Sequence, residues 1–145
     1  MGRYTVKKTL TGFPCVHRSP GHDGHCRFLH GYDRSFTFWF GCDARDDNGF
    51  VVDFGDLKPL RAWLEDLFDH TTLVNEDDPA LDTFRTLEAE GLIQLRLLPD
   101  TSTEGCAKYV FEHADSWVRE RTGGRAWCVR VEARENTKNA ALYEP

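Results

Sequence analysis

The sequence lacks the features of several large classes of protein. It contains no apolar run as long as a membrane span, and residues 1–8 lack the apolar core of a signal peptide. It has no run of Lys and Arg, and its formal net charge of −6 argues against a nucleic-acid surface. Internal repeats, low-complexity tracts and linkers are also absent. We therefore expect one cytoplasmic domain over residues 1–145, with neither a membrane nor a nucleic acid as its partner.

A disulfide framework is not expected either. The chain has 5 cysteines, an odd number, and no C-x-x-C pair, which suits reduced thiols better than disulfides. Four of them fall in strand or helix patterns and are expected to be small buried hydrophobes: Cys15, Cys42, Cys106 and Cys128. Cys26 lies instead in a polar, glycine-rich loop, so it is the cysteine for which we expect a function.

Apolar periodicity predicts strands towards both ends of the chain and helices between them. The predicted strands cover residues 3–17, 34–42, 93–97, 128–135 and 140–143. The predicted helices lie at residues 55–68 behind the cap Asp53, from about residue 79, and behind a capping box at 101–104. Helices segregated onto one face of an antiparallel sheet make an α+β domain.

The most concentrated chemistry lies in residues 17–30, which hold four of the 6 histidines together with Cys26. His17 ends the first predicted strand and His30 precedes the second, so the two rings can converge. Neutral imidazole is a common zinc ligand, and a thiolate near such a centre can act as a base or nucleophile. The alternative is a set of loop histidines that bind no metal; the clustering favours a metal site.

Two further candidates lie outside this loop. Asp69 precedes His70 just after the first predicted helix, where a carboxylate can fix the imidazole tautomer and form a proton relay. Alternatively, His70 only complements the negative end of the helix dipole. Glu135 continues an apolar alternation, so its carboxylate either faces inward and needs donors, such as the N–H groups of a flat heterocycle, or simply reaches water.

Six motifs follow one another along the chain, at residues 13–18, 26–32, 49–58, 68–70, 102–104 and 135. In this order they resemble the motifs of the 6-pyruvoyl-tetrahydropterin synthase family, most closely its bacterial 6-carboxy-tetrahydropterin synthase branch, which serves queuosine biosynthesis. The resemblance implies a tunnelling fold, in which a four-stranded antiparallel sheet carries two main helices on one face. It also implies a homo-oligomer built from trimers, usually a hexamer, with active sites between subunits.

The resemblance further implies a zinc-dependent carbon–oxygen lyase. Its substrate would be 7,8-dihydroneopterin triphosphate and its product 6-carboxy-5,6,7,8-tetrahydropterin, with loss of triphosphate and acetaldehyde, or else the 6-pyruvoyl product. His17 and His30 would hold zinc, which acidifies the substrate hydroxyls. By the same resemblance, proton transfer belongs to Cys26, Asp69 and His70, and pterin binding to Glu135, Ser102 and Thr103.

One departure from the family pattern concerns the metal site. Residues 26–32 read C-R-F-L-H-G-Y where the family has C-x-x-x-H-G-H, so Tyr32 stands in the place of the third metal-binding histidine. His25, next to Cys26, is the replacement we expect, with His22 or Tyr32 itself as alternatives. The departure also leaves open a diverged enzyme that only cleaves the pterin side chain, or a metal- or pterin-binding module without turnover.

Overall fold

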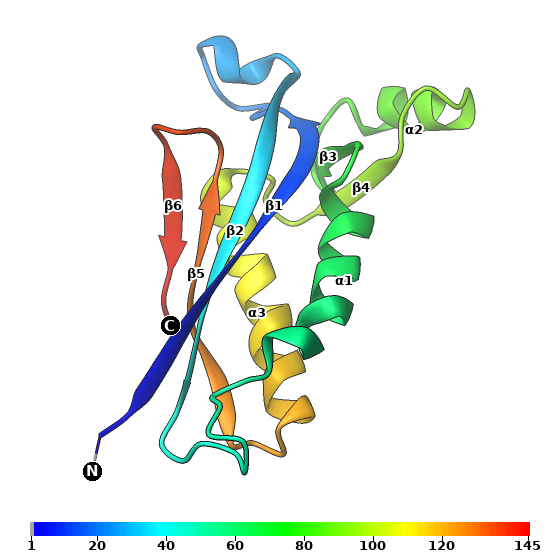
Figure 1. The fold of residues 1–145 in the computed structure, drawn as a ribbon. Coiled ribbons are helices and arrows are strands. Elements are labelled where there is room, and N and C mark those ends of the chain that lie inside the picture. The colour runs from blue at the N-terminus through cyan, green and yellow to red at the C-terminus, as the bar shows by residue number, and fades with distance from the viewer. Residues whose placement is uncertain (1) are drawn as a thin grey trace.

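The computed structural model describes residues 2–145, which form three α-helices and a six-stranded sheet (Figure 1). The strands are β1 (Tyr4–His17), β2 (His30–Cys42), β3 (Thr71–Asn75), β4 (Leu95–Leu98), β5 (Ala126–Arg134) and β6 (Ala140–Tyr143). The helices are α1 (Lys58–Phe68), α2 (Leu81–Ala89) and α3 (Thr103–Arg121), with 3-10 turns at His25–Arg27 and Phe54–Leu57. None of the helices in residues 2–145 has the length and apolar character to span a membrane.

The sheet is mixed, with the strand order β4-β3-β1-β2-β5-β6. The pairs β1–β2, β2–β5 and β5–β6 are antiparallel, whereas β3 pairs with β1 and β4 in parallel. The expectation of a four-stranded antiparallel sheet is therefore wrong. The strand that was missed, β3, is buried throughout Thr71–Val74 and so shows no alternation, as is usual for parallel strands.

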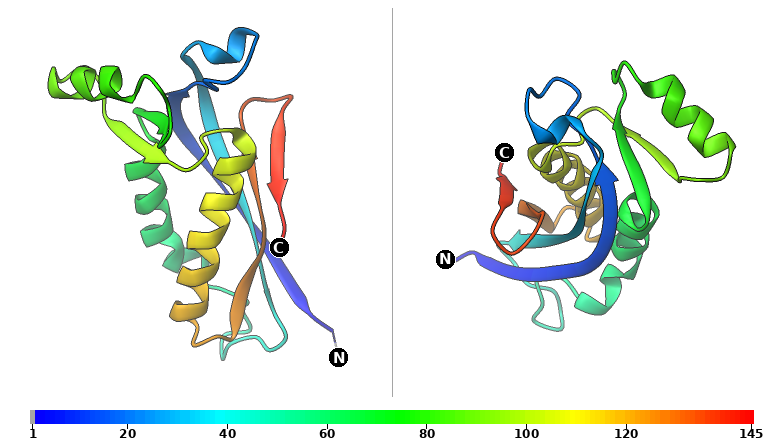
Figure 2. Two further views of the ribbon diagram at one scale, coloured as in Figure 1. Left: turned by 180° about the vertical axis from the view of Figure 1, so that it is seen from behind. Right: turned by 90° about the horizontal axis from the view of Figure 1, so that it is seen from above.

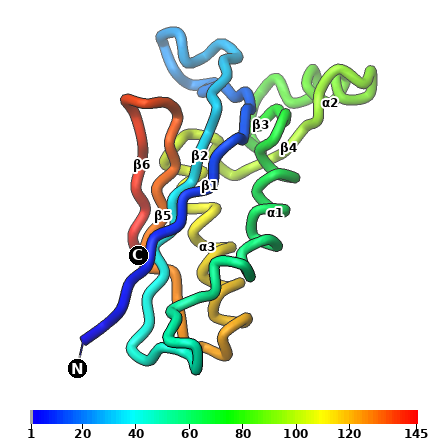
Figure 3. The backbone as a smooth tube through the Cα atoms, viewed as in Figure 1, coloured from blue at the N-terminus to red at the C-terminus, as the bar shows by residue number. Residues whose placement is uncertain are grey.

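Two helices cover one face of the curled sheet, as Figures 1 and 2 show. The helices α1 and α3 pack against each other, with the Trp63 ring stacked on His113 at 3.7 Å between centroids. Between them and the sheet lies the core, in which Phe36, Phe38 and Phe40 of β2 are fully buried. Helix α2 and strand β4 extend to one side of this body (Figure 3). The α+β architecture is confirmed.

Side-chain caps begin α3 and the 3-10 turn that leads into α1. The Asp53 carboxylate accepts a hydrogen bond from the Gly55 amide at 2.9 Å, and a 3-10 turn then leads into α1. At α3 the N-cap is Ser102, whose hydroxyl accepts from the Gly105 amide at 3.0 Å. The capping box predicted at residues 101–104 is wrong by one residue, because the third helical position is a glycine and has no side chain to reach back.

A β-bulge in β1 decides which side chains face the helices. The pairing with β2 shifts between Leu10 and Phe13, and Gly12 there has φ of 90°, a conformation that glycine adopts at little cost. Before the bulge Leu10 is the buried side chain; after it the buried side chains are Phe13, Cys15 and His17. The bulge therefore turns the last part of β1 so that His17 points inward.

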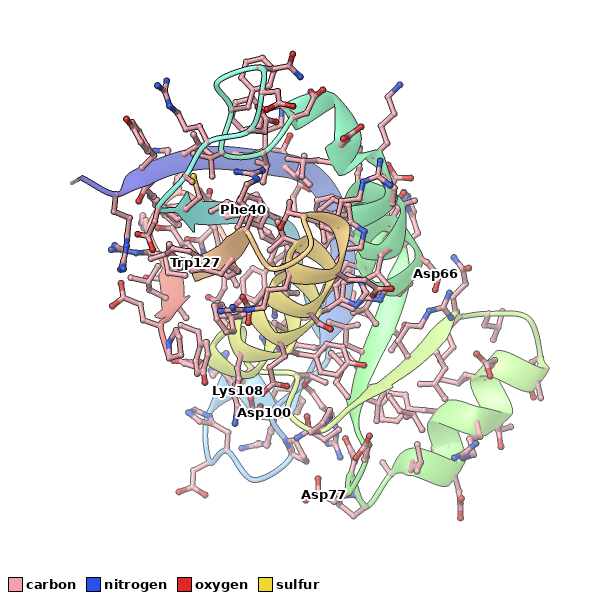
Figure 4. The ribbon with its side chains drawn as sticks, turned by 90° about the horizontal axis from the view of Figure 1, so that it is seen from below. Phe40, Asp66, Asp77, Asp100, Lys108 and Trp127 are labelled. Carbon is pink, nitrogen blue, oxygen red and sulfur yellow. The ribbon has the colours of Figure 1, made fainter. Side chains whose placement is uncertain are left out.

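A second irregularity shifts the pairing of β2 with β5, between Trp39 and Phe40. Phe40 and Trp127 lie close together at this end of the sheet (Figure 4). The shift takes Val129 out of the inward alternation of β5, whose buried positions are Ala126, Cys128, Val131 and Ala133. Glu135 follows Val131 and Ala133 at the same spacing, and so continues the buried face.

Candidate functional site

Two imidazole rings meet where β1 ends and β2 begins. His17 is paired with His30 across the strands, and their ring centroids are 4.6 Å apart. His17 is 4% exposed, and neither of its ring nitrogens has a hydrogen-bond partner. His30 Nδ1 lies 2.7 Å from the Phe28 carbonyl oxygen, which leaves its Nε2 for another ligand. Buried polar atoms without partners are rare in folded proteins, and two facing imidazoles are a natural metal-binding pair.

The surroundings of His17 keep its ring neutral. Burial, the Arg34 guanidinium and the His30 ring together lower the pKa of His17 to about 4. A neutral imidazole keeps a lone pair on one nitrogen, which is the form that binds a metal. The orphaned nitrogens and the neutral charge state both fit a divalent cation held by His17 and His30.

Tyr32 lies beside both histidine rings, where a third metal ligand would be needed. Its ring centroid lies 5.8 Å from that of His17 and 5.3 Å from that of His30. His25 lies exposed in the 3-10 turn, and across residues 2–145 no three His, Cys, Asp or Glu side chains gather as a metal-binding group. The structure therefore brings His17 and His30 together but does not place His25 with them, so His25 as third ligand stays a prediction. His22 instead accepts a hydrogen bond from the Gly24 amide through Nδ1.

The loop that carries Cys26 is held to the body of the protein by an ion pair. Arg18 donates to both carboxylate oxygens of Asp78, through Nε at 2.8 Å and Nη2 at 2.5 Å, and the Asp78 side chain is fully buried. Asp77 and Asp100 lie beside the same loop (Figure 4). Cys26 is exposed on this loop, while the other four cysteines are buried, as predicted.

Glu135 lies one residue beyond the end of β5 and points back into the protein. Its carboxylate accepts a hydrogen bond from the hydroxyl of Thr103, in the first turn of α3. Burial, and the nearby carboxylate of Glu135 and thiol of Cys26, raise the pKa of Tyr32. Tyr32 and Glu135 also line an open pocket of about 480 Å³, a volume suited to a small bicyclic ligand. Thr103 and Tyr32 therefore lie beside the Glu135 carboxylate.

Ser102 and Thr103 play different parts, although we expected both to bind the substrate. The Ser102 hydroxyl caps α3, while Thr103 is buried and contacts Glu135. In this arrangement Ser102 fixes the start of the helix, and Thr103 is the residue that reaches the site.

Sequence reasoning missed Arg34, the largest of the fully buried side chains, at 1% exposure. Its Nη1 donates to the Thr103 hydroxyl at 3.3 Å, and its guanidinium carbon lies 5.6 Å from the centroid of the Tyr32 ring. The signal was present in the sequence, because Arg34 continues the inward alternation of Phe36 and Phe38. A charged residue in an apolar alternation marks a buried polar site.

Asp69 and His70 form the predicted pair, with Asp69 Oδ1 2.6 Å from His70 Nδ1. His70 has φ of 58°, the left-handed region, and its amide donates to the Pro14 carbonyl oxygen at 2.7 Å. A non-glycine residue in this region costs about 1 kcal/mol, so its surroundings must fix it there. The His70 side chain is 79% exposed, so its free nitrogen faces solvent rather than the site around His17 and Glu135.

Comparison with known proteins identifies the relatives of the chain. The family model described as 6-pyruvoyl tetrahydropterin synthase matches residues 5–145. The 6-carboxy-5,6,7,8-tetrahydropterin synthase of Rickettsia felis is 34% identical over 67 residues, which cover 46% of this chain and 49% of the relative. This alignment thus spans about half the length of the curated relative it matches.

Solved structures share the fold at low sequence identity. An uncharacterized protein from Wolinella succinogenes superposes with a TM-score of 0.85 at 17% identity, over 99% of both chains. The 6-pyruvoyl tetrahydropterin synthase of Plasmodium vivax superposes with a TM-score of 0.68 at 16% identity, over 98% of both chains.

Proposed function

Because this chain belongs to the 6-pyruvoyl tetrahydropterin synthase family, as the match over residues 5–145 shows, we propose that it is a lyase of pterin metabolism. Its proposed substrate is 7,8-dihydroneopterin triphosphate. The product is 6-carboxy-5,6,7,8-tetrahydropterin, the compound named in its curated relatives, with release of triphosphate and acetaldehyde. The observation that carries this proposal is that Tyr32 lies beside the His17–His30 pair and also lines one pocket with the carboxylate of Glu135.

The proposed cofactor is zinc. His17 and His30 would hold the ion through ring nitrogens that the protein leaves without other partners. Tyr32 lies where a third ligand would stand, with His25 of the neighbouring loop as the predicted alternative. When bound, zinc supplies Lewis acidity to the hydroxyl groups of the substrate side chain.

The ring of the pterin would be recognised by Glu135. Oε1 of Glu135 accepts the Thr103 hydroxyl, and the second lone pair of Oε1 together with Oε2 stays available for a ring N–H and the neighbouring amino group. A carboxylate only accepts hydrogen bonds, so it selects a heterocyclic edge that donates two of them side by side. This selection is the role we propose for the inward orientation of Glu135.

Proton transfer would belong to Cys26 and to the Asp69–His70 pair. Cys26 is the one exposed cysteine of residues 2–145, and it is close enough to Tyr32 to help raise the pKa of that phenol. Asp69 holds the proton of His70 on Nδ1, which leaves Nε2 to accept a proton from a substrate. Because His70 faces outward, we propose that it serves the site of a neighbouring subunit in a trimer-based hexamer.

Direct assay tests the proposed activity. Purified protein supplied with zinc and 7,8-dihydroneopterin triphosphate should release triphosphate and acetaldehyde and yield the mass of the carboxylated tetrahydropterin. Because Tyr32 stands where a third metal-binding histidine is expected, two alternative functions are considered, and the same assay distinguishes them. A shortened side chain with no triphosphate elimination would indicate a side-chain-cleaving enzyme. Unchanged substrate with fully metal-loaded protein would overturn the lyase proposal and leave a binding module.

Two variants separate chemistry from binding. Cys26→Ala should abolish turnover while the affinity for 7,8-dihydroneopterin, measured by fluorescence, stays within about twofold. Glu135→Gln should weaken that affinity by about tenfold or more, because an amide presents a donor to the donors of the ring. Cys42→Ala removes a buried thiol from the far end of β2 and is the matched control. Equal losses of binding in both variants would contradict the assigned roles.

A further inference from the structure

Arg34 carries a buried positive charge that no carboxylate neutralises directly. None of the ion pairs in residues 2–145 includes it, and its Nη2 has no hydrogen-bond partner. The thiols beside it, Cys15 and Cys106, are neutral, because burial raises the pKa of both. Burying a cation without a paired anion costs several kcal/mol. A residue kept at that cost must serve something other than packing.

The contacts of Arg34 lead to the two side chains beside Glu135. Its Nη1 donates to the Thr103 hydroxyl, and its guanidinium lies over the ring of Tyr32. Both of these side chains are next to the Glu135 carboxylate. Thr103 donates a hydrogen bond to it, and the carboxylate helps to raise the pKa of the Tyr32 hydroxyl. Arg34 itself is too deeply buried to touch a ligand.

The hydrogen-bond chain also has a fixed direction. A guanidinium can only donate hydrogen bonds, so the Thr103 oxygen accepts from Arg34. The hydroxyl has one proton, and that proton is then directed at Glu135. Without Arg34 the hydroxyl would be free to rotate and could turn its proton elsewhere, as serine and threonine hydroxyls do.

We propose that Arg34 is a positioning residue for Glu135. It orients Thr103 and supports Tyr32, and through these two side chains it fixes the carboxylate that receives the pterin ring. The inference rests on the proposed function for the assignment of Glu135 to that ring. The three residues come from different parts of the chain, with Arg34 on β2, Thr103 on α3 and Glu135 after β5.

A set of variants at two positions tests the chain of contacts. Arg34→Met keeps an unbranched apolar side chain but removes the charge and the donors, and Thr103→Val keeps the shape of threonine but removes its hydroxyl. Each should raise KM, and Kd for 7,8-dihydroneopterin, by about tenfold with kcat changed less than about twofold. The double variant should lose no more affinity for 7,8-dihydroneopterin than either single variant. Thr103→Ser, which keeps the hydroxyl, should bind as the wild type does.

A matched control separates positioning from stability. Arg125 is another arginine that holds the fold, through hydrogen bonds to the backbone oxygens of Ala44, Phe50 and Val51. Arg125→Met should lower the unfolding midpoint without raising KM. Unchanged KM in Arg34→Met, or losses that multiply to about a hundredfold in the double variant, would overturn the inference.

The proposed function can fail separately. If the wild-type protein does not bind 7,8-dihydroneopterin, the assignment of Glu135 to a pterin ring is overturned. The link between Arg34 and Thr103 is then decided by urea unfolding of the same single and double variants without ligand. Non-additive changes in unfolding free energy support the link, and additive changes overturn it.

Discussion

The burial of His17 predicts how the stability of the metal-free protein depends on pH. In the folded chain the pKa of this ring is about 4, chiefly because of burial, against 6.5 as the ordinary value. Between these two values the unfolded chain binds a proton that the folded chain does not. Proton binding by the unfolded chain therefore lowers the free energy of unfolding as pH falls through this window. Above about pH 6.5 neither state binds the proton, and the full free energy of unfolding is retained.

The size of the effect follows from the two pKa values. Each pH unit between about 4 and 6.5 is worth about 1.4 kcal/mol, so the whole window contributes roughly 3 kcal/mol. About 2 kcal/mol of this falls between pH 7 and pH 5. His17 is 4% exposed, so solvent screening reduces the figure little.

Urea unfolding of wild type and His17→Phe, in the presence of a chelator, measures this contribution. Phenylalanine fills the buried space and does not titrate, so carboxylate titrations common to both proteins cancel in the difference. The difference in unfolding free energy should change by about 2 kcal/mol in favour of the variant from pH 7 to pH 5. His22→Asn, in the exposed loop, is the control and should follow wild type. A difference independent of pH would refute the argument that His17 is buried and neutral.

Three further perturbations test the site and its supports. Tyr32→His should raise zinc affinity at least tenfold in a competition assay, because it places a third imidazole on β2 beside His17 and His30. Unchanged affinity would indicate that the third ligand comes from the loop. Asp78→Ala should cost about 3 kcal/mol in urea unfolding, since it leaves the Arg18 guanidinium without its buried partner; a loss below 1 kcal/mol would show that the ion pair is dispensable. Gly12→Ala should cost about 1–2 kcal/mol, because the bulge requires φ of 90° while the space around the glycine is open; an equally stable variant would show that the bulge relaxes.

Much of the site could be read from the sequence because its parts lie at the ends of regular elements. The ends of two predicted strands indicated that His17 and His30 can converge, and the two residues are paired across β1 and β2. The alternation in β5 left open whether Glu135 faces inward or reaches water, and the structure has it hydrogen-bonded to Thr103. The paired Asp69 and His70 were predicted from adjacency alone, and their ring and carboxylate do meet. These inferences needed only the period of a strand and the chemistry of the side chains.

Other features could not be predicted in this way, because they depend on distant segments. The parallel strand β3 has a uniformly buried sequence that carries no period, so its place in the sheet appears only with its partners. The outward position of His70 depends on a left-handed backbone held by the Pro14 carbonyl of another strand. Tyr32 was recognised as a departure from a motif, but its place beside both histidines follows from strand pairing.

By itself the sequence determined the α+β character of the protein, the Asp53 cap before the first main helix, and the set of imidazole, thiol and carboxylate groups from which the site is made. The tertiary structure decided which of these groups face one another. A single extra residue at Gly12 turns Phe13, Cys15 and His17 toward the helices, because a shift of one position exchanges the two faces of a strand. Arg34 reaches Thr103, 69 positions away, and Thr103 reaches Glu135, 32 positions further on. Contacts of that range depend on strand register and helix packing, which local sequence patterns do not encode.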